Sequence, residues 1–89
     1  MARISFTERL RAVGPVAPAA YEGATLIAVL DAVARDYPLL KPYVLDDQGR
    51  IRKHVAIFID GELKRGQAAL ALALAPTSEI YVMQALSGG

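Results

Sequence analysis

The stretch TLIAVLDAVARDYP, residues 25–38, decides the fold because it is the most regularly periodic segment of the chain. Its apolar side chains recur at the three- and four-residue spacing of one helix face: Leu26, Val29, Leu30, Val33 and Tyr37. Thr25 is suited to cap the helix, and Pro38 ends it, because the residue before a proline avoids helical backbone. The stretch predicts one amphipathic helix that must cover a sheet to bury its apolar face.

Segments on the N-terminal side of this helix show the two-residue alternation of β-strands. Ile4 and Phe6 alternate with polar residues and predict a first strand. The stretch VAPAAYEG, residues 16–23, predicts a second strand, which Pro18 confines to a sheet edge or a bulge. After the helix, LLKPYVLDDQGR, residues 39–50, is expected to form a loop.

The C-terminal half of the chain adds three further strands. RKHVAIFIDGEL, residues 52–63, predicts a central strand, a type I′ turn at Asp60-Gly61 and the start of a return strand. QAALALALAP, residues 67–76, favours a short helical turn, and EIYVMQ, residues 79–84, predicts the last strand. The order β, β, α, β, β, β predicts an α+β domain over residues 1–84, a mixed sheet wrapped on one main helix.

Composition excludes several classes of function. The 89 residues predict one domain, and ten Lys and Arg against nine Asp and Glu give a net charge of +1, which argues against nucleic-acid or membrane partners. The chain has no cysteine, so disulfides, thiolate nucleophiles and cysteine-ligated zinc are excluded. No apolar run is long enough for a signal peptide or a membrane span, which predicts a cytoplasmic protein.

No group of side chains predicts an enzyme, a bound cofactor or a metal site. His54 is the only histidine, and the Asp46-Asp47 pair is typical of turn chemistry. Phosphate-binding loops and dinucleotide fingerprints are absent from the sequence. A small basic patch either is a solvated face or steers an acidic partner: Arg50, Arg52, Lys53 and His54.

The sequence ends on Gly88-Gly89, shortly after the last predicted strand. Residues 85–89 are expected to form a flexible tail that reaches at most about 17 Å. Glycine lacks a Cβ, so such a tail can enter a narrow channel of another protein. The α-carboxylate of Gly89 is ionised at neutral pH and unreactive, but as an acyl-adenylate it would accept a sulfur or amine nucleophile. The plainer interpretation is a frayed terminus.

Four segments resemble the MoaD/ThiS family of ubiquitin-like (β-grasp) sulfur carrier proteins, in its MoaD-like branch: ISFTERLRAVG (4–14), ATLIAVLDAVARDYP (24–38), DDQGRIRKHVAIFIDGEL (46–63) and APTSEIYVMQALSGG (75–89). They cover nearly the whole chain, and the strand followed by the diglycine end is the most specific of them. The resemblance implies a β-grasp fold. It also implies that the C-terminal glycine carries a thiocarboxylate.

The resemblance implies that the chain is a carrier, which catalyses no reaction without a partner enzyme. Gly89 would be adenylated and converted to the thiocarboxylate, Gly88 would give access, and Leu86 and Ser87 would orient the tail. ATP would be used by a ubiquitin-activating-type (MoeB/ThiF-like) adenylyltransferase, with sulfur from a donor such as a persulfide-carrying protein. A synthase subunit would consume the sulfur for molybdopterin, cysteine or a thio-containing metabolite, so the chain could be the small subunit of a sulfurtransferase such as molybdopterin synthase.

Two other functions fit the same sequence. A ubiquitin-like protein modifier would form isopeptide bonds through Gly89, and a β-grasp interaction module would carry an inert tail. Strand alternation also places Phe58, Tyr81 and Met83 on the face opposite the helix, which predicts a partner-binding face. The alternatives are that these side chains mediate self-association or that QAALALALAP covers them.

Overall fold

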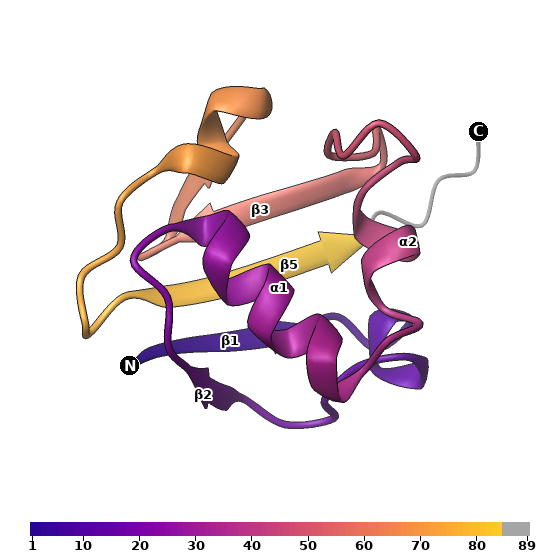
Figure 1. The fold of residues 1–89 in the computed structure, drawn as a ribbon, viewed down its shortest axis with the longest axis horizontal. Coiled ribbons are helices and arrows are strands. Elements are labelled where there is room, and N and C mark those ends of the chain that lie inside the picture. The colour runs from indigo at the N-terminus through magenta and orange to yellow at the C-terminus, as the bar shows by residue number, and fades with distance from the viewer. Residues whose placement is uncertain (85–89) are drawn as a thin grey trace.

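Five strands form one mixed sheet in the order β2-β1-β5-β3-β4 (Figure 1). The computed structural model describes residues 1–84. The strands are β1 (Ala2–Phe6), β2 (Ala19–Tyr21), β3 (Val55–Ile59), β4 (Glu62–Lys64) and β5 (Glu79–Gln84). The first and last strands, β1 and β5, run parallel at the centre, and the other pairs are antiparallel.

The main helix, α1 (Leu26–Asp36), lies across one face of the sheet (Figure 1). The Thr25 hydroxyl caps it by accepting a hydrogen bond from the backbone N–H of Ala28 at 3.3 Å. At the other end the Tyr37 N–H still reaches the Val33 carbonyl at 2.9 Å, and Pro38 follows. The predicted cap and end of the helix are therefore confirmed. One helix held by a mixed sheet in this order is the ubiquitin-like β-grasp fold, as predicted.

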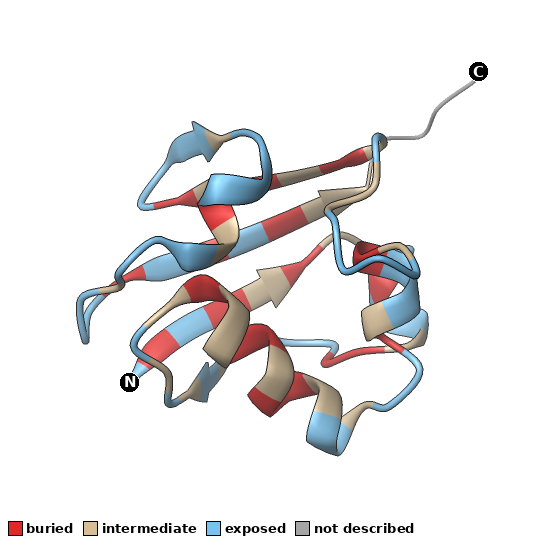
Figure 2. Ribbon diagram, turned by 45° about the horizontal axis from the view of Figure 1, so that its top comes forward, coloured by how far each residue is buried: buried red, intermediate tan, exposed pale blue. Residues whose placement is uncertain are grey.

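A single hydrophobic core lies between α1 and the sheet. Burial alternates along the central strands, as the red bands of Figure 2 show. The largest fully buried side chains come from strands, helices and loops together: Phe6, Ile4, Leu10, Leu26, Leu40, Ile57, Ile80, Val29, Val33, Val44 and Val82. The amphipathic face predicted for the helix is thus the face that packs on the sheet.

Thr25→Ala should destabilise the protein by about 1 kcal/mol, because the part-buried N-terminus of α1 then loses the hydroxyl that accepts from the Ala28 N–H. Chemical denaturation with a helix-sensitive signal measures this change. Thr77→Ala, at an exposed site for which the structure gives no side-chain hydrogen bond, is the matched control and should change stability by less than about 0.5 kcal/mol. Equal losses in the two variants would contradict a capping role.

Two short helical elements were not predicted as such. One lies in the expected loop over residues 39–50, and the other lies between the first two predicted strands. Helix α2 (Lys41–Val44) replaces part of the loop expected over residues 39–50, and the turn η1 (Leu10–Ala12) follows β1. Pro42 in the first turn of α2 suits a helix start, where its missing N–H costs nothing. Leu40 and Val44 are buried, so packing rather than periodicity stabilises this single turn.

The hairpin and the apolar segment after it agree with the sequence. Asp60 and Gly61 both have positive φ, 52° and 84°, as a type I′ turn requires. The segment that favoured a helical turn contains η2 (Gln67–Ala71). Its continuation is tied to the start of α1, because the Leu26 N–H donates to the Leu72 carbonyl and the Leu74 N–H donates to the Ala24 carbonyl.

Candidate functional site

An apolar cluster lies on the sheet face opposite α1. Phe58 of β3 is paired with Tyr81 of β5 on one side and with Leu63 of β4 on the other, and Ala56 is paired with Met83. The Phe58 and Tyr81 rings have centroids 6.4 Å apart, within the range of favourable aromatic contact. We call Phe58, Leu63, Tyr81 and Met83 the open-face patch.

The open-face patch is accessible to a partner. Tyr81 and Leu63 are each 38 % exposed, and Phe58 and Met83 are half-buried. The expected placement of Phe58, Tyr81 and Met83 opposite the helix is confirmed. Leu63 was missed as a member, because its face depends on the register of β4 against β3 rather than on a pattern within its own three-residue strand.

The hypothesis that QAALALALAP covers this patch is wrong. Ala69 is 2 % exposed and belongs to the core, and Leu70 and Leu74 pack against the same core. The segment is joined to the loop before α1 through the pair of Thr25 with Ala73. It therefore closes the core on the helix side and leaves the opposite sheet face uncovered by this part of the chain.

The C-terminal end of β5 is held from both sides at the centre of the sheet. Gln84 is paired with Val55 of β3, and its N–H donates to the Thr7 hydroxyl at 3.1 Å beyond the end of β1. The Thr7 N–H in turn donates to the Val82 carbonyl at 3.1 Å. The covalent attachment point of residues 85–89 is thus fixed relative to the open-face patch. Leu86, Ser87, Gly88 and Gly89 lie outside the described residues.

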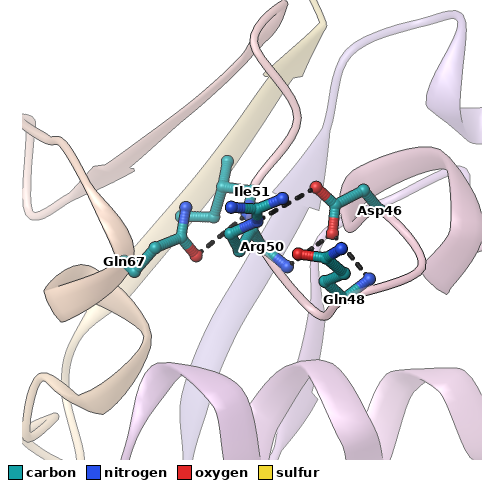
Figure 3. Close-up of polar contacts among 5 residues, drawn as sticks. All are labelled: Asp46, Gln48, Arg50, Ile51 and Gln67. Atoms are coloured by element: carbon teal, nitrogen blue, oxygen red, sulfur yellow. Dashed lines mark hydrogen bonds and ion pairs between the residues drawn. The ribbon is translucent and has the colours of Figure 1, made fainter.

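The loop between α2 and β3 is built by side-chain hydrogen bonds (Figure 3). One Asp46 carboxylate oxygen accepts from the N–H groups of Gln48 and Arg50, both at 2.9 Å, and the other lies 3.5 Å from the Arg50 Nε. The bond from the Arg50 N–H, followed by that from Gln48, lowers the pKa of Asp46 below its usual value. Asp46 therefore acts as a turn residue, as its sequence context predicted.

The described part of the chain offers neither a metal-binding cluster nor a membrane-spanning helix. Within residues 1–84, no group of three or more His, Cys, Asp and Glu side chains lies close enough to hold a metal ion. Over the same residues, no helix has the length and apolar character needed to cross a membrane.

Together, the fold and this site define a small ubiquitin-like β-grasp protein with an apolar open face that includes part of β5. The crystal structure of SAMP1 from Haloferax volcanii matches with a TM-score of 0.79 and 25% identity, over 99% of this chain and 98% of that one. Mycobacterium tuberculosis CysO matches with a TM-score of 0.85 and 24% identity, over 97% and 100%. A chain of the Amycolatopsis orientalis BexX/CysO complex matches with a TM-score of 0.87 and 18% identity, over the full length of both chains.

These structural matches confirm the resemblance to MoaD/ThiS-like β-grasp proteins over nearly the whole chain. By sequence, no protein-family model matches, and no curated protein does either. The likeness is therefore carried by the structure, over nearly the full length of the chain.

Proposed function

We propose that this protein is a sulfur carrier whose C-terminal glycine carboxylate is converted to a thiocarboxylate. One observation carries the proposal: β5 ends at Gln84 in the centre of the sheet, next to the open-face patch, and leads to Gly88-Gly89. A partner that docks on the patch would receive the last residues at a defined position. Five residues reach at most about 17 Å, enough to enter a cleft while the domain stays outside.

The proposed chemistry needs a partner for each step. A carboxylate oxygen of Gly89 attacks the α-phosphorus of ATP on an adenylyltransferase, and pyrophosphate leaves. The terminal sulfur of a persulfide donor then attacks the acyl-adenylate carbonyl, and AMP leaves with the bonding electron pair. A thiol reduces the resulting acyl disulfide, which leaves the thiocarboxylate on this chain and a disulfide between the donor and that thiol. Binding of ATP belongs to the partner in this proposal.

The comparisons support a protein partner and also a second candidate function. A similar chain occurs in the BexX/CysO complex, which supports docking of this chain on another protein. SAMP1 from Methanosarcina acetivorans is described as a small archaeal modifier protein and has a TM-score of 0.82 with this chain. That likeness favours protein modification as the second candidate, in which a lysine amine instead of sulfur attacks the activated Gly89.

Intact-mass spectrometry tests the proposal. The protein is incubated with ATP, a persulfide donor, a thiol reductant and, in turn, each ubiquitin-activating-type adenylyltransferase encoded in the source genome. The expected product carries one sulfur in place of one oxygen at its C-terminus. Conjugates to lysine residues without any thiocarboxylate would favour the modifier function. An unmodified protein with every such enzyme would refute both functions and leave the inert-tailed module.

Met83→Asp is expected to weaken binding to the adenylyltransferase by about 1–2 kcal/mol, roughly tenfold, because docking would bury an unpaired charge. Met83 is half-buried on the open-face patch and is the member nearest to the attachment point at Gln84. Titration calorimetry measures the change. Leu39→Asp, at an apolar site 68 % exposed outside the patch, is the matched control. Wild-type affinity in a folded Met83→Asp protein would place docking on another surface.

A further inference from the structure

A cleft of about 340 Å³ lies between the start of β3 and the end of β4, and its charged residues are all basic. Arg52, Lys53 and Arg65 line it together with His54, and among residues 1–84 no acidic side chain does. The chain as a whole carries a net charge of only +1, so this concentration of positive charge is local. We call these four residues the basic cleft.

In residues 1–84, none of the cationic side chains of the cleft forms an ion pair with a carboxylate. The ion pairs found there join Lys41 to Asp31, Arg50 to Asp46 and Lys64 to Glu62. Arg52 donates its Nε to the Pro42 carbonyl at 2.8 Å, and it lies near Asp46, whose pKa its charge helps to lower. Lys53 and Arg65 are exposed. Like charges gathered in this way repel one another, and an anionic ligand would relieve that repulsion.

The cleft adjoins the candidate site. Leu63 lines the cleft and belongs to the open-face patch, and Ala56 lines the cleft and is paired with Met83. Val55, also a lining residue, is paired with Gln84, the last described residue. A protein that covers the open-face patch and receives the chain end would therefore also contact the cleft.

A hydrogen bond links the two sides of the cleft. The Ile51 N–H donates to the Gln67 side-chain carbonyl at 3.2 Å (Figure 3), and both residues line the cleft. This bond joins the loop before β3 to η2, the two chain segments on either side. The segment that carries Arg52 and Lys53 is therefore connected to the segment that follows Arg65.

We propose that the basic cleft binds an acidic segment, rich in Asp and Glu, of the partner protein that receives the C-terminal glycines. That the ligand belongs to this partner follows from the function proposed above. That the ligand is acidic is inferred from the basic residues of the cleft alone. An acidic peptide fits better than a nucleic acid, because the charge is confined to one cleft beside an apolar patch. Nucleic-acid binding normally requires a more extended basic surface and a clear basic excess.

The first test needs no natural partner. A ten-residue glutamate peptide is titrated into the isotope-labelled protein, and backbone amide shifts are recorded. We expect shifts confined to residues 51–56 and 63–67. The double variant Lys53→Glu/Arg65→Glu should bind at least tenfold more weakly, whereas Arg9→Glu/Arg35→Glu, which makes the same charge change at exposed sites outside the cleft, should bind like the wild type.

Three outcomes of this titration would overturn the proposal. They are shifts located elsewhere, equal affinity in the two double variants, and tighter binding of a ten-residue thymidine oligonucleotide than of the peptide. Thermal melting of both double variants is measured alongside, so that loss of binding is not attributed to loss of fold.

A second test uses whichever adenylyltransferase modifies the wild-type protein. Lys53→Glu/Arg65→Glu should slow association about tenfold at low salt, and the rates should converge near 1 M salt, where the Debye length is about 3 Å. The final thiocarboxylate yield at saturating enzyme should be unchanged. Unchanged rates with normal modification would overturn the cleft proposal alone. Failure of every enzyme to modify the wild type would instead refute the carrier function, and the peptide titration would still decide the cleft.

Discussion

Deletion of Gly89 is expected to reduce thiocarboxylate formation at least a hundredfold without changing the melting temperature. The shortened chain still ends in glycine, but its carboxylate lies one residue, about 3.5 Å, short of the required position. Misplacement of a reacting group by as little as about 1 Å can cost a hundredfold in rate. The fold should be unaffected, because the core residues of the described structure lie between Ala2 and Val82.

Intact mass and thermal melting of the same sample decide this prediction. Gly89→Ala is the matched control, since it keeps the length of the chain and adds only a methyl group. It should retain more activity than the deletion if position matters most. If the protein without Gly89 gained sulfur at the wild-type rate, the assignment of Gly89 as the acceptor would be wrong.

Leu30→Ala is expected to lower the free energy of unfolding by about 2–5 kcal/mol. Leu30 is 3 % exposed and lies in the core between α1 and the sheet, so truncation removes buried apolar surface and leaves a cavity. A domain of this size has only about 5–15 kcal/mol of stability in total, so the loss would be a large share. The melting temperature should fall by roughly 10 °C or more.

Urea denaturation of Leu30→Ala beside Arg35→Ala measures the effect. Arg35 is exposed on the same helix, so its truncation should cost less than about 0.5 kcal/mol. A loss below about 1 kcal/mol at Leu30 would mean that the packing around α1 differs from the structure described above.

Local signals were sufficient to predict most of the fold. The apolar spacing of residues 25–38 predicted α1, and Asp60-Gly61 predicted the hairpin, because each pattern reflects backbone geometry within a few residues. Helix α2 was not predicted, since four residues are too few to show a helical period. Its position depends on the burial of Leu40 and Val44 against residues distant in sequence.

The candidate site was predictable only in part, for the same physical reason. Alternation along β3 and β5 placed Phe58, Tyr81 and Met83 correctly, because both strands are long enough to define their faces. The sheet face of Leu63 and the side on which the 67–76 segment packs depend on contacts between distant parts of the chain, so local patterns do not predict them. The sequence shows the basic residues at 50–54 as a group. Arg65 lies close to them only because the hairpin places β4 beside β3, which the local sequence does not show.

The central position of β5 has a consequence for synthesis of the protein on the ribosome. Because β1 and β3 both pair with this last strand, a nascent chain that stops before Glu79 would leave two unpaired strand edges, a state prone to aggregation. Pairing of β1 with β5 joins segments more than 70 residues apart, so the sheet must close late. Tyr81 and Met83 are themselves on β5. If the open-face patch is the docking surface, as proposed above, only a chain translated to this strand can present it in full, and prematurely terminated molecules would not compete for the partner.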